Sequence, residues 1–95
     1  KEMEIWKQIN NYSKYEISDN GKVRNKETQK EISQKSLDKD GYPTVKLYND
    51  NGVRKKLYVR RLVAEAFIPN PENLKSVRLK NGDKFDNDVS NLFWK

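Results

Sequence analysis

Residues 41–71 read GYPTVKLYNDNGVRKKLYVRRLVAEAFIPNP and contain the clearest structural pattern in the chain. Val45 and Leu47 alternate with other residues, as do Leu57 and Val59 after an Asn-Gly turn. This period of two, together with the turn, predicts a β-hairpin with one buried face. We expect the opposite face to carry cations between aromatic rings, namely Lys46, Tyr48, Lys56 and Tyr58.

A short helix is expected directly after this hairpin. Apolar residues recur at helical spacing from Leu62 to Phe67, and Pro69 ends the helix because proline cannot continue it. The helix should pack its apolar side against the hairpin, with two cations at its start, Arg60 and Arg61.

Weaker strand patterns lie on both sides of this segment. Residues 15–24 predict a small β-hairpin around an Asn-Gly turn, and residues 25–41 predict a loop with one short strand at 31–34. Residues 77–79 and 92–94 are expected to form strand pieces joined by a polar loop. The predicted fold class is therefore α+β.

The length and composition favour one compact domain. A chain of 95 residues is too short for two independent cores. We divide it into an N-terminal region, 1–40, and a second region, 41–95. Hydrophobic residues make up only 34%, so we expect an aromatic-anchored core built on Trp6, Phe67 and Trp94. The chain has neither Cys nor His, which excludes disulfides and the usual zinc sites.

The excess of positive charge is concentrated in the central hairpin and the start of the helix. The chain has 20 basic and 14 acidic residues, a net charge of +6. Residues 42–61 contain six basic residues and one acid, which is five of those six net charges. This distribution predicts a polyanionic partner, and an ordinary solvated surface is the alternative. The candidate nucleic-acid-binding residues are Arg24, Lys46, Tyr48, Arg54, Lys55, Lys56, Tyr58, Arg60 and Arg61.

An acidic loop near the C-terminus could supply oxygen ligands to a cation, because Asp83, Asp86 and Asp88 lie close together. Their spacing lacks the other signs of a calcium loop, so we expect a solvated turn with Asx caps. We assign no metal and no cofactor.

The order of these motifs resembles two known protein families. The segment EIWKQINNYSKYEISDNGKVRN (residues 4–25) resembles the nuclease-associated modular domain, which binds DNA. The rest, from DGYPTVKLY (40–48) through LVAEAFIPNPEN (62–73) to NLFW (91–94), is similar to the HNH homing endonucleases of phages and mobile introns. The resemblance covers nearly the whole chain. It implies that the C-terminal strands are a remnant of the family's ββα-metal hairpin.

The chain departs from the family pattern at the positions that would carry catalysis. The resemblance implies an Asn-His or Asp-His pair, a metal ligand followed by the general base, where this chain has Arg78 and Leu79. Arg60 replaces a further histidine of the pattern. The family's last helix would follow the final strand, and the sequence ends at Lys95, before it. Hydrolysis by this mechanism needs a metal and a positioned base, so we expect no nuclease activity.

Two functions from different classes remain open. The first is a catalytically inactive, HNH-like protein that binds double-stranded DNA. The second is a phage-encoded inhibitor that blocks a host protein, such as a defence-system nuclease or a replication factor. A third reading, a longer chain with an active partner domain, is opposed by Leu79. The resemblance implies a phage or mobile-element origin, and no apolar run is long enough for a membrane span, so we expect a cytoplasmic location in a bacterial host.

Overall fold

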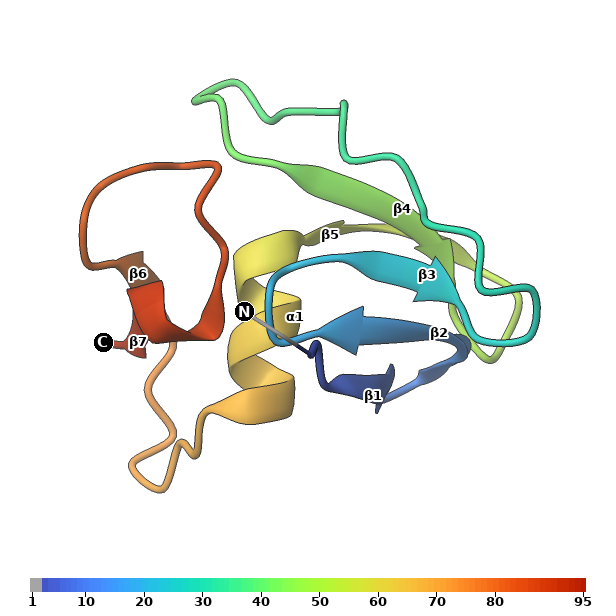
Figure 1. Ribbon diagram of the computed structural model, residues 1–95, viewed down its shortest axis with the longest axis horizontal. Coiled ribbons are helices and arrows are strands. Elements are labelled where there is room, and N and C mark those ends of the chain that lie inside the picture. The colour runs from blue at the N-terminus through green and yellow to red at the C-terminus, as the bar shows by residue number, and fades with distance from the viewer. Residues whose placement is uncertain (1–2) are drawn as a thin grey trace.

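The computed structural model describes residues 3–95 and places one helix between three small antiparallel sheets (Figure 1). The first sheet contains β1 (Trp6–Ile9), β2 (Tyr12–Ser18) and β3 (Val23–Asn25). The second is the hairpin of β4 (Thr44–Tyr48) and β5 (Arg54–Tyr58), and the third pairs β6 (Val77–Leu79) with β7 (Leu92–Trp94). Helix α1 (Val59–Phe67) and the short 3₁₀ helix η1 (Val89–Asn91) complete the chain. The predicted α+β class is confirmed.

The N-terminal sheet is built on two tight turns. Asn11 adopts a left-handed conformation (φ 70°) between β1 and β2, and Gly21 does so (φ 84°) between β2 and β3. The predicted hairpin of residues 15–24 is confirmed, with Ile17 opposite Val23. Strand β1, which was not predicted as a separate element, pairs with β2 on its other side. The short strand expected at 31–34 reduces to a single bridge between Arg24 and Glu31.

The central hairpin has the predicted faces. Val45 and Leu47 are fully buried, whereas Lys46 and Tyr48 point to solvent. The strand prediction was wrong at Val59, which is the first residue of α1. Val59 lies three and four residues before the buried Leu62 and Val63, so the helical period also fits it and places it on the apolar side of the helix.

The core is aliphatic rather than aromatic, which corrects the expectation from composition. Its fully buried hydrophobic side chains are Ile, Val, Leu and Ala residues of β2, β3, β4 and α1, and Tyr15 is the only buried aromatic residue among residues 3–95. Phe67 and Trp94 are half-buried and pack against this core. Trp6 is half-buried under the guanidinium of Arg24, 3.9 Å from its ring centroid, rather than inside the core. Within residues 3–95 no helix is long and apolar enough to cross a membrane.

The C-terminal hairpin and its polar loop have the predicted form. Val77 pairs with Trp94 and Leu79 with Leu92. The loop carboxylates cap turns, as expected: Asp83 accepts a hydrogen bond from the amide of Phe85 (3.0 Å), and Asp88 accepts one from Ser90 (3.0 Å).

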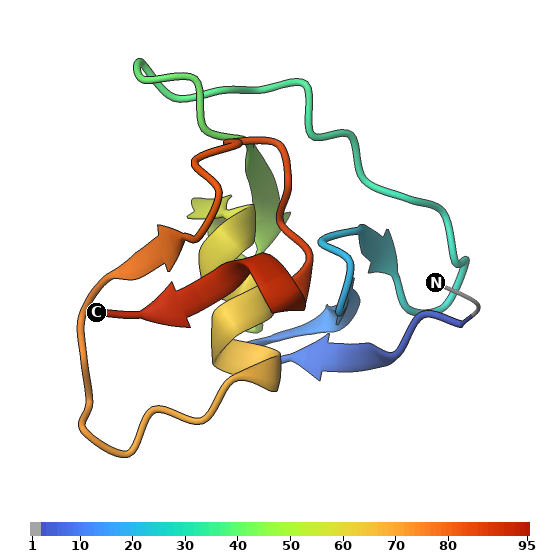
Figure 2. The same cartoon turned by 60° about the vertical axis from the view of Figure 1, so that its left-hand side comes forward.

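The β2–β3 turn docks against this C-terminal loop, which fixes the two ends of the chain to each other (Figure 2). The amide of Val89 donates to the carbonyl oxygen of Asp19 at 2.8 Å. A Cβ atom on Gly21 would lie 2.9 Å from the Cβ of Asn87, so this turn has no room for a side chain. The N-terminal region and the C-terminal region therefore share packing as well as one hydrophobic cluster. The division at residue 40 stays a prediction.

Candidate nucleic-acid interface

The outer face of the β4–β5 hairpin carries cations that have no partner within residues 3–95. Lys46 lies directly opposite Lys56, and Tyr48 lies opposite Arg54. All four side chains are exposed, and no ion pair or side-chain hydrogen bond joins the three cations to another described residue. This set, Lys46, Tyr48, Arg54 and Lys56, is called the hairpin face below.

The pairing of Lys46 with Lys56 has an energetic cost. Like charges directly opposite each other destabilise an antiparallel pair, whereas opposite charges stabilise it. The second hairpin of the molecule has the favourable arrangement, with Glu16 opposite Arg24. The hairpin face therefore lowers the stability of the free protein and would favour an anion placed over it.

Two carboxylates fix the hairpin at its two ends. At the tip, Asp50 accepts hydrogen bonds from the hydroxyl (2.7 Å) and the amide (2.8 Å) of Ser13. At the base, Asp38 accepts bonds from the amide of Tyr42 (2.9 Å) and the hydroxyl of Tyr58 (2.8 Å). The cations are thus presented on a strand pair that is attached to the rest of the molecule at both ends.

These hydrogen bonds change the acidity of the groups that form them. The hydroxyl and then the amide of Ser13 lower the pKa of Asp50. The amide of Tyr42, followed by the Tyr58 hydroxyl, lowers the pKa of Asp38. The same bond to Asp38 raises the pKa of the Tyr58 phenol. Both carboxylates are consequently charged at neutral pH and hold the hairpin through charge-assisted bonds.

The remaining predicted site residues lie elsewhere. Lys55 is exposed on the opposite face of the hairpin, across from Leu47. Arg24 is half-buried and donates to Glu16 at 2.8 Å while it stacks on Trp6. Arg24 therefore has an internal partner, and its predicted extension of the DNA-binding patch stays a prediction.

Helix α1 positions two further arginines in different ways. Arg61 donates to the carbonyl oxygen of Lys75 at 2.7 Å and to Glu65 at 3.1 Å, so it ties the helix to the segment before β6. Arg60 lies between two rings instead, 4.4 Å from the centroid of Tyr42 and 4.5 Å from that of Tyr58.

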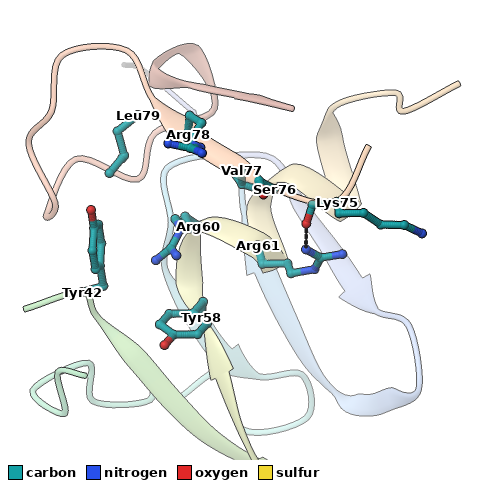
Figure 3. Close-up of a pocket in the computed structure, with 9 residues that line it drawn as sticks. All are labelled: Tyr42, Tyr58, Arg60, Arg61, Lys75, Ser76, Val77, Arg78 and Leu79. Carbon is teal, nitrogen blue, oxygen red and sulfur yellow. Dashed lines mark hydrogen bonds between the residues drawn. The ribbon is translucent and has the colours of Figure 1, made fainter. Parts of the chain in front are cut away.

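Arg60 faces a cleft of about 400 Å³ that separates the start of α1 from strand β6 (Figure 3). Arg78 and Leu79 line this cleft from β6, across from Arg60. The three departures from the expected catalytic pattern therefore meet in one place, although residues 60 and 78 are far apart in the chain. The complete lining is Tyr42, Tyr58, Arg60, Arg61, Lys75, Ser76, Val77, Arg78 and Leu79.

The residues of this cleft do not fit a metal ion. The lining contains four cationic side chains and no carboxylate, histidine or side-chain amide. Hard divalent cations need oxygen ligands and are repelled by guanidinium and ammonium groups. Leu79, at the position where the resemblance implies a general base, has no atom that accepts a proton.

Sequence reasoning missed two contributors to this cleft. Lys75 was not singled out, and Arg78 was noted as a substitution rather than as part of a site. The hydrogen bonds of Asp38 to Tyr42 and Tyr58 were also missed. The signal was weak, because each residue lies in a different segment and only the fold brings them together.

The chain is similar in sequence to a known motif and to two viral proteins. The NUMOD4 motif matches residues 4–48. The chain is 40% identical over 89 residues to "Uncharacterized HNH endonuclease L245" of Acanthamoeba polyphaga mimivirus, a match that covers 94% of this chain and 26% of that protein. It is 41% identical over 98 residues to "Uncharacterized HNH endonuclease L247" of the same virus, which covers 99% of this chain and 24% of that protein.

A solved structure has the same fold. It is described as "DNA binding and cleavage by the HNH homing endonuclease I-HmuI" and matches with a TM-score of 0.83 and 34% sequence identity. The match covers 96% of this chain and 52% of that one. The present chain thus spans about a quarter of the length of the curated relatives, by the 26% and 24% coverage, and about half of the solved chain.

Proposed function

We propose that this chain, which is HNH-like and of the NUMOD type, binds double-stranded DNA through the hairpin face and does not cut it. The observation that carries the proposal is the hairpin face itself: three exposed cations without an internal partner within residues 3–95, two of them directly opposite each other. A two-stranded ribbon fits the major groove of B-DNA, and Lys and Arg side chains on it can contact phosphates. The HNH relatives of Acanthamoeba polyphaga mimivirus support a viral or mobile-element origin.

The absence of cutting rests on the chemistry of Arg78 and Leu79. Activation of water needs a proton acceptor, and leucine offers none. Arginine remains charged at every working pH and would oppose a divalent cation at the neighbouring position. These two residues therefore support a protein that keeps the DNA-binding frame without hydrolysis.

The first experiment measures binding to a random-sequence duplex by fluorescence anisotropy at several salt concentrations. The affinity should fall steeply with salt, because each neutralised phosphate releases counterions. The double variant Lys46→Glu/Lys56→Glu should lower the slope of log K against log salt by about 2 and weaken binding more than about tenfold. The matched control is Lys80→Glu/Lys95→Glu, which makes the same change of net charge on the β6–β7 segment and should have a smaller effect.

The outcomes separate the possible functions. If the wild-type protein does not bind duplex DNA at low salt, the proposal fails, and the host-protein inhibitor becomes the function to test. If both double variants weaken binding equally, the attraction is a general effect of net charge and the hairpin face is not the interface. Nicking of a supercoiled plasmid by purified protein with Mg²⁺ would contradict the non-cutting part of the proposal.

A further inference from the structure

The cleft between α1 and β6 differs from the hairpin face because its cations are held in place. Arg60 is fixed between the rings of Tyr42 and Tyr58, and a guanidinium stacked on aromatic rings loses little further freedom when it binds a ligand. Asp38 accepts a hydrogen bond from the Tyr58 hydroxyl, which positions that ring, and one from the Tyr42 amide, which fixes the backbone that carries the other ring. Arg60 is therefore oriented before any ligand arrives.

Arg78 completes the cationic lining from the other side. It lies on β6 opposite Phe93, is exposed, and makes no ion pair or side-chain hydrogen bond within the described part of the chain. Figure 3 shows Arg60 and Arg78 on the two walls of the cleft, with Leu79 beside Arg78. Asp38 is the acid whose charge acts on Arg60, and its carboxylate is occupied by the hydrogen bonds to Tyr42 and Tyr58.

These features describe a site for an oxyanion. The guanidinium group presents donors in a planar fork that matches two oxygens of a phosphate. The apolar side chains of Val77 and Leu79 line the same cleft, and charge-assisted bonds are stronger beside apolar groups than in bulk water. The cleft has a volume of about 400 Å³, which is enough for a phosphate group and part of its two flanking sugars.

We propose that the cleft binds one backbone phosphate of DNA directly, with the guanidinium groups of Arg60 and Arg78 in the place of a metal ion. This inference rests on the proposed DNA-binding function and adds a second contact to it. Tyr42 and Tyr58 act as positioning residues that orient Arg60. Binding at this contact is independent of divalent metal.

The test compares salt dependence in three variants. Arg60→Gln/Arg78→Gln should lower the slope of log K against log salt by about 1, because the contact with one phosphate is lost, and Arg78→Gln alone should lower it by less. Arg78 is exposed and makes no ion pair or side-chain hydrogen bond within residues 3–95, so the single variant should test the cleft without disturbing the fold. Arg78→Lys keeps the charge and loses the fork, so it should retain the slope while its affinity falls several-fold. EDTA should leave wild-type binding unchanged.

A direct readout locates the phosphate. In NMR titrations with a short duplex, the Nε–Hε signals of Arg60 and Arg78 should shift, whereas that of Arg61, which is bonded to Lys75 and Glu65, should shift less. Inorganic phosphate is the second probe and distinguishes a free anion from the DNA backbone. It should shift the same two signals only at much higher concentration.

The results separate this inference from the function on which it rests. If Arg60→Gln/Arg78→Gln retains the wild-type slope while Lys46→Glu/Lys56→Glu lowers it, the cleft inference is overturned and the proposed DNA binding stands. If the slope falls but neither arginine signal shifts, the effect is long-range and the direct contact is overturned. If the wild-type protein binds no duplex, both proposals fail. A preference for inorganic phosphate over duplex DNA would also overturn the inference.

Discussion

The hairpins β2–β3 and β4–β5 are both closed by an Asn-Gly pair, yet they use their charges in opposite ways. In β2–β3, Glu16 lies opposite Arg24 and the two side chains form an ion pair at 2.8 Å. In β4–β5, the corresponding cross-strand pair is Lys46 and Lys56, which repel each other. The first hairpin pairs these two charges inside the molecule, whereas the cations of the second have no ion-pair partner within residues 3–95.

The two turns also differ in how closely they pack against the rest of the molecule. Gly21 is buried against the C-terminal loop, whereas the space around Gly52 is open. The β4–β5 hairpin is nevertheless held at both ends by Asp38 and Asp50. The anchors of this hairpin therefore lie outside the face that carries the exposed cations. The comparison indicates that one local signal in the sequence can serve packing in one place and recognition in another.

The largest expected difference between the hairpins is in their glycines. Gly21→Ala should destabilise the protein by about 2–4 kcal/mol, because alanine is strained at positive φ and its Cβ would meet Asn87. Gly52→Ala is the matched control. Gly52 has a similar φ of 79°, and a Cβ added there would have no atom within 4 Å, so this substitution should cost only about 1–2 kcal/mol. Urea denaturation of both variants measures the difference. Equal losses would mean that the docking of the first turn adds nothing.

A second prediction concerns the two arginines on the hairpins. Arg24→Ala should lower the free energy of unfolding by about 1–2 kcal/mol, because it removes a half-buried ion pair and the stack on Trp6. Arg54→Ala should change stability by less than about 0.5 kcal/mol. We expect the reverse order for DNA affinity. A larger loss of affinity in Arg24→Ala than in Arg54→Ala would contradict the division of roles between the hairpins.

A third prediction exploits the like-charged pair. Lys56→Glu should stabilise the protein by about 0.2–1 kcal/mol, because it turns a repulsive cross-strand pair into an attractive one. The same variant should bind DNA more weakly. Lys55→Glu, on the adjacent residue opposite Leu47, is the control and should not gain stability. Thermal unfolding of the two variants and an anisotropy titration make the comparison. A loss of stability in Lys56→Glu would refute the cost assigned to the hairpin face, and a gain in DNA affinity would contradict its proposed role in binding.

The smallest expected effect is on the pH dependence of stability. The pKa of Asp38 is lowered in the folded state from its ordinary value of 3.8, so its stabilising contribution is present above that value and is lost as the pH falls through the folded pKa. Asp38→Asn should lower the melting temperature at neutral pH, and the difference from the wild type should shrink below pH 3.8. Glu72→Gln, which removes one charge from an exposed loop, is the control and should run parallel to the wild type. If the difference in melting temperature between Asp38→Asn and the wild type stays constant with pH, the charged Asp38 carboxylate does not anchor the hairpin.

Local sequence was sufficient for the elements that depend on neighbouring residues. The Asn-Gly turns with alternating flanks predicted the existence of both hairpins, whereas their register, with Glu16 opposite Arg24 in β2–β3, is a finding of the structure. The strand prediction for Val59 was wrong because its position fits both the strand period and the helical period. In the structure Val59 is the first residue of α1 and is buried.

The candidate site was predictable in part. The hairpin face follows from alternation alone, so Lys46, Tyr48 and Lys56 were found. The cleft was not found, because Arg60 and Arg78 are brought together by the packing of β6 and α1. The stack of Arg60 on Tyr42 likewise depends on a loop whose path has no periodic signal. Contacts between distant segments carry the part of the site that sequence patterns do not contain.

Strand β5 passes into α1 without an intervening loop, since Tyr58 is both the last strand residue and the N-cap of the helix. Lys56 and Arg60 are therefore joined by an unbroken run of regular backbone. If both contact one duplex, the backbone sets the distance between these two cations. Such a fixed spacing would select for the shape of the double helix rather than for its base sequence. One residue inserted after Tyr58 would turn the helix by about 100° and change the relative position of the two cations, although both side chains would still be present.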